Sequence, residues 1–188
     1  MIYLVIMTEE IVRIYKAYNS GKLGDTTMPE DTFPIFRSYG EKLAYYTLPM
    51  SLNYQRDSFS LWKSAKQTYE DTQTNYVFDI SKIGDREELK NSLLKYKLAL
   101  QPNKHIDSWY RISNTIYTKY NSINELILST NSDYLNLKQV IQVENKKGFP
   151  YLSGPKIFNY WVYILDRYCD IKIKNREYIE IASDTHVI

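Results

Sequence analysis

Two short stretches near the end of the chain carry side chains that can do chemistry. Lys156 follows Ser153-Gly154-Pro155, a sequence that favours a helix N-terminus, where backbone N–H groups attract an anion. Asp184 stands beside a threonine and a histidine in residues 183–188. An amine can act as a nucleophile and a carboxylate can stabilise developing positive charge. The two groups form a reactive pair if the fold brings them into one cleft.

Together the two stretches resemble the active-site element of the helix-hairpin-helix DNA glycosylase superfamily. Residues 149–156 read FPYLSGPK, where the family has a Leu-Pro-Gly-Val-Gly-x-Lys-like hairpin, and residues 183–187 read SDTHV, like its Val-Asp-Thr-His-Val segment. Gly154 and Lys156 match the Gly-x-Lys step, and Asn159 matches a small polar position after it. Leu152 replaces the earlier glycine of the pattern. The resemblance covers roughly the last fifth of the chain.

The resemblance implies a DNA N-glycosylase that excises a damaged or mismatched base in base excision repair. Asp184 would stabilise the oxocarbenium-like sugar as the glycosidic bond breaks. Lys156 would attack C1′ to form a Schiff base, which adds AP-lyase activity through β-elimination. The implied partner is double-stranded DNA with a damaged base, and the implied cofactor and metal requirement is none.

The same resemblance assigns further residues to DNA contact. The turn and the lysines before it would contact the phosphate backbone, and such contacts do not depend on the base sequence. The residues concerned are Leu152, Ser153, Gly154, Lys146 and Lys147. The target nucleotide must swing out of the duplex into a pocket. Weaker candidates for that pocket are Asn53, Gln55, Trp161 and His186.

Other interpretations of the same residues stay open. Lys156 can be an ordinary solvated lysine at a helix start, and Asp184 a helix N-cap. A non-catalytic nucleic-acid-binding module would use the hairpin for phosphate contact alone. An N-glycosidase acting on a modified nucleoside or an RNA base would keep Asp184 and dispense with Lys156. His105, near another helix start, is more typical of a structural histidine than of a catalytic one.

Hydrophobic periodicity predicts the elements that position these residues. Seven or eight helices with short connections indicate an all-α chain, which we interpret as a multi-helix fold of the glycosylase kind. We expect one helical domain over 1–188, with the helix-hairpin-helix at about 133–170 and the Asp motif at 183–188. Residues 171–181 alternate in polarity and predict a small β-hairpin insertion. The interval from Lys156 to Asp184 is 28 residues, longer than the family's, and the insertion would account for the extra length.

Individual helices are predicted from N-cap residues and from stripes of apolar residues. A helix is predicted to begin at Thr8, and a long core helix from Ile35 to about Gln55 is predicted to be bent or broken at Pro49. A capping box at Asp85 opens another helix. The helix after Gly154 has an apolar stripe made of Ile157, Phe158, Trp161, Val162 and Leu165.

Composition limits the remaining possibilities. The chain has 188 residues, enough for a real core, and its net charge of +2 neither requires nor excludes nucleic acid. Its 19 tyrosines suit a core rim, an interface or a base-stacking surface. The single cysteine, Cys169, excludes an internal disulfide and a four-cysteine iron–sulfur cluster, which favours a reducing, cytoplasmic setting.

The two ends of the chain add two expectations. Residues 1–7 are apolar, but they lack a basic flank and are too short to span a bilayer, so no membrane association is expected. The chain stops four residues after Asp184, before the helix that the family places there. This predicts a shortened protein, or one that keeps the scaffold without activity.

Overall fold

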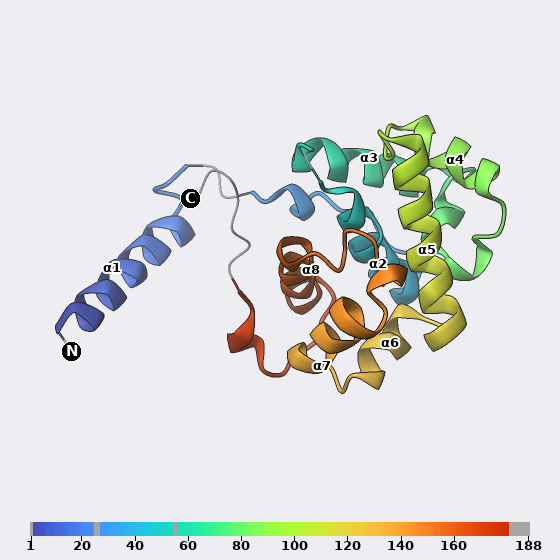
Figure 1. Cartoon of the computed structure of the whole chain (residues 1–188). Coiled ribbons are helices and arrows are strands. Elements are labelled where there is room, and N and C mark those ends of the chain that lie inside the picture. The colour runs from blue at the N-terminus through green and yellow to red at the C-terminus, as the bar shows by residue number, and fades with distance from the viewer. Residues whose placement is uncertain (1, 25–26, 55, 181–188) are drawn as a thin grey trace. The chain divides into compact units, whose positions relative to one another are not determined.

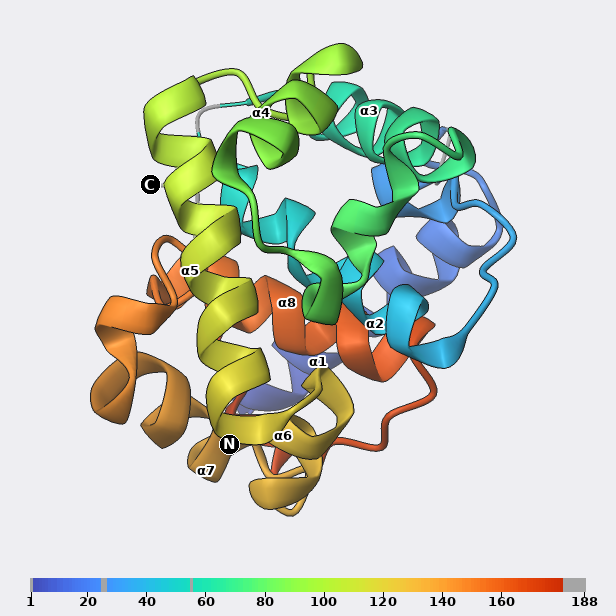
Figure 2. The same ribbon diagram turned by 90° about the vertical axis from the view of Figure 1, so that its right-hand side faces the viewer.

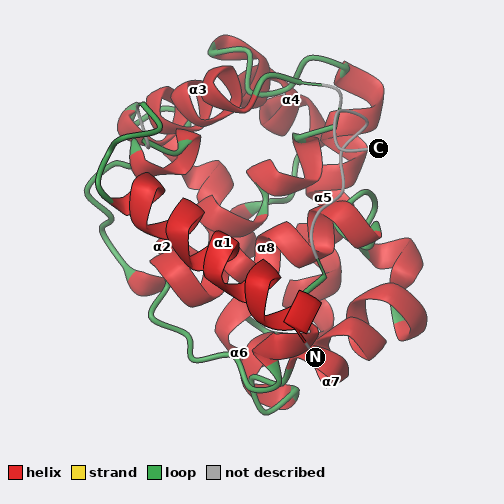
Figure 3. Ribbon diagram, turned by 90° about the vertical axis from the view of Figure 1, so that its left-hand side faces the viewer, coloured by secondary structure: helices red, strands yellow, loops and turns green. Residues whose placement is uncertain are grey.

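The computed structural model describes residues 2–24, 27–54 and 56–180. Within these ranges the backbone forms helices and loops, with eight α-helices and no strand (Figure 3). The predicted all-α class is therefore confirmed. The chain divides into two units, Met1–Thr32 and Phe33–Ile188.

The first unit contains the helix α1, Ile2–Asn19. The predicted start at Thr8 is wrong, because the helix already includes the apolar run before it, whose leucine, isoleucine and methionine are adequate helix formers. The glycines after Asn19 end the helix, as their residue type predicts. Gly21 and Gly24 follow the helix at positive φ angles of 70° and 102°, a region that glycine enters without a steric penalty.

The second unit holds the other seven helices. They are α2 (Tyr39–Thr47), α3 (Ser58–Glu70), α4 (Arg86–Lys95), α5 (Pro102–Tyr120), α6 (Ile123–Ser129), α7 (Tyr134–Lys138) and α8 (Pro155–Tyr168). The long helix α5 runs from the end of this unit that contains α3 and α4 to the end that contains α6 and α7 (Figures 1 and 2). Helices α2 and α8 pack against each other. Helix α8 carries the candidate lysine.

Side-chain caps decide where several helices begin. Asp85 accepts hydrogen bonds from the backbone N–H groups of Glu87 and Glu88, so the predicted cap of α4 is confirmed. The long helix predicted from Ile35 to about Gln55 is wrong in its bounds, but the break predicted at Pro49 is confirmed. Its counterpart α2 begins only after Ser38, whose hydroxyl accepts from the N–H of Glu41, and Pro49 opens a separate 3-10 turn.

The core is unusually aromatic. All three tryptophans are fully buried, and three tyrosines and three phenylalanines are at most 1% exposed. These residues are Trp62, Trp109, Trp161, Tyr45, Tyr46, Tyr134, Phe78, Phe149 and Phe158. The Trp109 indole donates to the carbonyl of Val77, and the Trp161 indole donates to the Thr47 hydroxyl. The predicted apolar stripe of α8 is confirmed, because all five of its residues are buried.

The β-hairpin predicted for residues 171–181 is absent from the described part of that segment. Ile171 and Ile173 are buried and the lysines beside them are exposed, so the alternation itself is real. Its backbone partner, however, lies at the start of α7: Lys174 receives a hydrogen bond from the N–H of Tyr134 and donates one to Ser132. An extended segment can satisfy an alternating pattern by packing on helices, so alternation does not require a second strand.

Two further properties concern the described residues as a whole. None of the helices within them is long and apolar enough to cross a lipid bilayer. Cys169, at the end of α8, is fully buried, and its burial raises the pKa of the thiol to about 12. The thiol is thus kept in its unreactive protonated form at neutral pH.

Candidate functional site

A tight turn over residues 149–154 delivers Lys156 to the surface. Phe149 and Leu152 are fully buried and hold the turn against the core. Tyr151 adopts a left-handed φ of 59°, which lets the chain reverse before α8. Gly154 is the N-cap residue, and Lys156 follows it as an exposed residue in the first turn of the helix. The prediction that Lys156 lies just inside a helix N-terminus is confirmed.

The backbone amides of this turn are already engaged. The N–H of Leu152 donates to Pro150 at 2.7 Å, that of Ser153 to Phe149 at 2.9 Å, and that of Gly154 to Tyr151 at 2.9 Å. Because each of these donors has an acceptor inside the turn, contact with a phosphate falls to neighbouring side chains. The side chains of Leu152 and Ser153 are themselves buried.

A basic cleft of about 550 Å³ lies immediately before the turn. Its lining residues are Thr115 and Lys119 of α5 and the run Val143, Glu144, Asn145, Lys146, Lys147 and Gly148. Lys146 and Lys147, both predicted to contact nucleic acid, are exposed here. A Cβ on Gly148 would lie 2.6 Å from the Thr115 hydroxyl, so glycine is what allows this wall to approach α5.

Lys119 joins these lysines although the sequence pattern did not indicate it. It lies 26 residues before Asn145, on a different helix, and its ammonium group donates to the Asn145 side-chain carbonyl. Asn145 is buried and also donates to Val140 and to the Tyr120 hydroxyl. The cleft therefore gathers three lysines against one acidic residue, Glu144, a balance that favours an anionic ligand.

The loop before α3 lies against the turn before α8. The ring of Tyr54 approaches that of Tyr151, with centroids 5.7 Å apart and planes inclined by 32°. Tyr54 is 53% exposed, so the pair presents aromatic surface to solvent beside the Lys156 turn. Arg56 anchors the loop by donating to the carbonyls of Lys97 and Leu98. The predicted pocket residues Asn53 and Gln55 flank Tyr54 in the chain, and Tyr54 is the one whose ring makes this contact.

A buried asparagine connects α8 to the segment that follows it. Asn159 is 2% exposed, and its Oδ1 accepts from the Tyr134 hydroxyl at 2.7 Å and from the backbone N–H of Glu180 at 3.2 Å. Its Nδ2 donates to the carbonyl of Pro155 at 2.9 Å and to Glu180 Oε2 at 3.5 Å. Both donors and both acceptor positions of the amide are used. Lys138 adds an ion pair to Glu180 at 3.4 Å.

The structure thus unites some predicted site residues and separates others. Lys156 and Asn159 are three residues apart on α8, so their side chains are neighbours on the helix surface. Trp161, a weak candidate for the base pocket, is fully buried with its indole bonded to Thr47, which places it in the core. Asn53 accepts from the Ser58 hydroxyl at 3.2 Å near the start of α3. Asp184, His186 and Gln55 lie outside the described residues.

His105 is held as a neutral core residue. It is 5% exposed, and its Nδ1 accepts from the backbone N–H of Leu100 at 3.0 Å. Burial lowers the pKa of the imidazole, and the charges of Arg56 and Lys104 lower it further. Because Nδ1 accepts a backbone hydrogen bond inside the core, we assign His105 a structural role.

This environment predicts acid sensitivity. Because the pKa of His105 is lower in the folded state than its unfolded value of about 6.5, its contribution to the free energy of unfolding is complete above that pH and declines as pH falls. His105→Asn keeps an acceptor near the Nδ1 position without a titrating ring. Urea unfolding at about pH 7.5 and about pH 5.5 should show a smaller loss of stability for the variant than for wild type. Equal losses would contradict this account.

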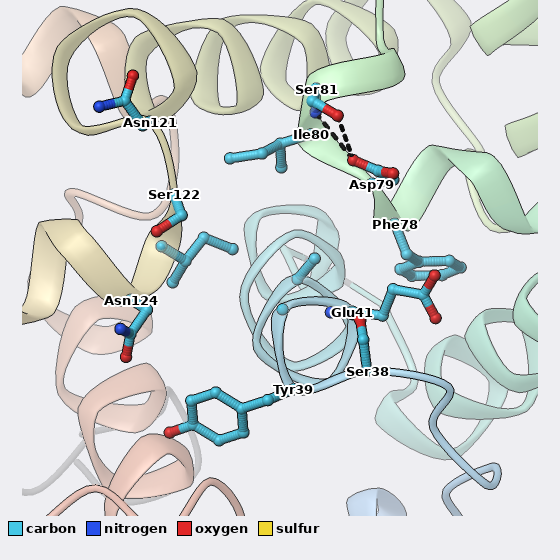
Figure 4. A pocket seen from close by; sticks show the side chains of 13 residues that line it. Ser38, Tyr39, Glu41, Phe78, Asp79, Ile80, Ser81, Asn121, Ser122 and Asn124 are labelled. Carbon is cyan, nitrogen blue, oxygen red and sulfur yellow. Dashed lines mark hydrogen bonds between the residues drawn. The ribbon is translucent and has the colours of Figure 1, made fainter.

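A second hollow, of about 340 Å³, lies away from the lysine turn (Figure 4). Its walls come from the first turn of α2, from residues 78–81 and from the link between α5 and α6. Its carboxylates have internal partners: Asp79 accepts from Ser81, and Glu41 forms a bidentate pair with Arg37 and accepts from Tyr69. The residues that line it include none of the predicted site residues.

Among the described residues, no group of three or more histidine, cysteine, aspartate or glutamate side chains is arranged to hold a metal ion. Comparison of the chain with models of protein families, with curated proteins and with solved structures gives no match. The function proposed next therefore rests on the geometry of the lysine turn and its neighbours.

Proposed function

We propose that this protein is a DNA N-glycosylase with AP-lyase activity, in which Lys156 and Asp184 act on a nucleotide turned out of the duplex. The observation that carries the proposal is the docking of Glu180 on α8. The backbone N–H of Glu180 donates to Asn159, one helical turn after Lys156. Asp184 follows four residues later along the chain, outside the described residues.

The chemistry of such a pair is consistent with glycosidic bond cleavage. As the bond from C1′ to the base breaks, its electron pair leaves with the base, which takes up a proton from solvent. The Asp184 carboxylate stabilises the positive charge that develops on the sugar. The uncharged amine of Lys156 bonds to C1′ and loses a proton, and the ring oxygen takes up a proton as the ring C–O bond opens to leave a protonated Schiff base. Removal of a C2′ proton then expels the 3′ phosphate.

The surroundings of the turn support DNA as the substrate. The cleft with Lys119, Lys146 and Lys147 offers positive charge to a phosphodiester backbone without reading its sequence. The exposed ring of Tyr54 and the partly buried ring of Tyr151 offer a stacking surface beside the lysine. An enzyme that turns out a nucleotide needs both a grip on the backbone and aromatic surface for unstacked bases.

Borohydride trapping tests the role of Lys156. The protein is incubated with a duplex that carries a preformed abasic site, and borohydride then reduces any Schiff base to a stable amine. We expect a covalent adduct with wild type and none with Lys156→Ala, because the imine requires that amine. Mass spectrometry should locate the adduct on Lys156.

A matched variant controls for general loss of positive charge. Lys172→Ala removes another exposed lysine, on the segment after α8, and should leave trapping unchanged. An undiminished adduct with Lys156→Ala would show that another amine reacts and would overturn the assignment. A wild type that forms no adduct would remove the lyase activity from the proposal.

The basic cleft favours a second candidate, a nucleic-acid-binding module without catalysis. Its three lysines belong to α5 and to the 3-10 turn Lys146–Gly148, and none of them is Lys156. Such a module would bind duplex DNA with strong salt dependence, would release no base, and would bind equally well after Asp184→Asn. Base release by the wild type decides between the two.

A further inference from the structure

We propose that Lys119 binds a phosphate of the DNA backbone and that Asn145 is the positioning residue that holds this lysine ready in the basic cleft. The inference deepens the proposed function, on which it rests only for the identity of the ligand. It involves neither of the residues proposed to act on the nucleotide. All of the groups concerned belong to α5 and to residues 139–148.

The lysines of the cleft differ from other lysines of this unit in what they pair with. Several lysines elsewhere form an ion pair with a carboxylate, namely Lys42, Lys95 and Lys138. Within residues 27–54 and 56–180, no ion pair involves Lys119, Lys146 or Lys147. Three positive charges therefore meet in one cleft without being neutralised by a bound carboxylate.

Lys119 is held in place by a neutral group. Its ammonium donates to the side-chain carbonyl of Asn145, which is 9% exposed. An ammonium has three N–H donors, and an amide oxygen carries no full charge. The contact thus orders the lysine while leaving its positive charge and two of its donors for a ligand. A carboxylate in the same place would order the lysine and cancel the charge.

Asn145 is itself fixed by the backbone around it. It follows a π-helical turn, Gln139–Glu144, and its N–H donates to the carbonyl of Val140, five residues earlier, at 3.0 Å. Its Nδ2 donates to the same carbonyl at 3.3 Å and to the Tyr120 hydroxyl at 3.2 Å. With Nδ2 engaged in this way, the side-chain oxygen is the atom that meets Lys119. Turns of the π type are rare and frequently occur at functional sites.

The α5 wall of the cleft adds a hydroxyl group. Thr115 lies four residues before Lys119, so the two side chains share one face of the helix. Within the described part of the chain the Thr115 hydroxyl has no hydrogen-bond partner. A hydroxyl donor beside an ordered ammonium group is a combination that suits a phosphate oxygen.

The composition of the cleft favours a backbone over a free nucleotide. Its three lysines outnumber its one acidic residue, Glu144, and the described residues that line it include no aromatic side chain. A base needs an aromatic or apolar surface on which to stack, whereas a phosphodiester needs positive charge and hydrogen-bond donors. Its volume of about 550 Å³ is in the range of sites that hold a whole small molecule, which is enough for a sugar–phosphate unit.

The salt dependence of DNA binding tests the role of Lys119. The probe is a short, undamaged, fluorescein-labelled duplex, and its anisotropy gives the binding constant between about 50 and 200 mM salt. Lys119→Met removes the charge and keeps most of the side chain. The slope of log K against log salt concentration should decrease in magnitude by about 0.9, the value of one phosphate contact. Two duplexes of unrelated sequence should show the same decrease.

Lys104→Met is the matched control. Lys104 is an exposed lysine of the same helix, 15 residues before Lys119, and so about 22 Å away along the helix axis. Its replacement removes an equal charge outside the cleft, and the slope should stay that of wild type. If Lys119→Met and Lys104→Met had the same slope, Lys119 would not be a phosphate contact and the inference would fall.

A double-mutant cycle tests the positioning role of Asn145. Asn145→Leu keeps the charge and the approximate volume, so the salt slope should persist. The Kd should rise by about 5- to 10-fold, because binding must then order a lysine side chain that was free. In the Lys119→Met background the same change should alter the Kd by less than about twofold. An equal cost in both backgrounds would show a purely structural role for Asn145 and overturn the positioning role.

Asn145→Asp is a second variant, of nearly the same shape, that keeps the test decisive if the leucine variant does not fold. Its carboxylate would hold Lys119 and cancel its charge, so the slope should decrease as in Lys119→Met. An unchanged slope would contradict the inference, as would a wild type that binds duplex without salt dependence. A wild type that binds through Lys119 but neither releases base nor forms an adduct would overturn the proposed function alone.

Discussion

Asp184→Asn is expected to lower base release from a damaged duplex by on the order of 10²–10³-fold. The asparagine has nearly the shape of the aspartate but no charge, so it cannot offset the positive charge that the sugar develops as the glycosidic bond breaks. Imine formation with a preformed abasic site should persist, because that step uses the amine of Lys156. Single-turnover release and borohydride trapping, measured side by side, check both halves of the prediction.

Glu180→Gln is the matched control for this variant. Glu180 is a carboxylate four residues earlier; its side chain is 60% exposed and pairs with Lys138. Its replacement removes one negative charge while the backbone contact to Asn159 remains, so release should stay close to wild type. If Asp184→Asn released base as fast as wild type, the acid of the proposed mechanism would have to be a different residue.

Trp161→Ala should have the largest effect on stability. The indole is fully buried on α8, its ring centroid lies 6.1 Å from that of Phe158, and its N–H donates to the buried Thr47 hydroxyl at 3.0 Å. Truncation leaves a cavity and removes the partner of that hydroxyl. Losses of about 3–5 kcal/mol in the free energy of unfolding are typical of such changes. Urea unfolding should measure this loss, and the melting temperature of the variant should be lower by roughly 10 °C.

The control for this prediction is an exposed aromatic residue. Phe59 on α3 is 58% exposed, and Phe59→Ala should change the free energy of unfolding by only about 0.5 kcal/mol. A Trp161→Ala protein as stable as Phe59→Ala would show that Trp161 is not packed as the structure places it. That outcome would reopen its assignment to a base-binding surface.

The success of the sequence predictions varied with the range of the interactions they depended on. The capping of α4 by Asp85 and the buried stripe of α8 involve residues within a few positions of each other, and both are confirmed. For the long helix predicted from Ile35, the break at Pro49 is confirmed, but the predicted start is wrong because the Ser38 cap, a local signal, was overlooked. The β-hairpin failed because its alternating residues pack on helices.

The candidate site shows the same division. The place of Lys156 in the first turn of α8 was predictable, since Ser-Gly-Pro before a lysine is a local signal for a helix start. The approach of Tyr54 to Tyr151 and the addition of Lys119 to the basic cleft were not predictable. These contacts join residues far apart in the chain, and a single sequence has no periodicity that reports which distant segments meet.

The sequence by itself determined the all-α class, the apolar face of α8 and the position of a lysine at the start of that helix, because these depend on hydrogen bonds and side-chain spacing within one or two turns. The tertiary structure alone decided that the turn amides bond internally and that Trp161 belongs to the core. It also decided that residue 180 returns to Asn159 beside Lys156. The physical reason is that packing and the pairing of buried polar groups are settled between segments distant in the chain, after the local elements have formed.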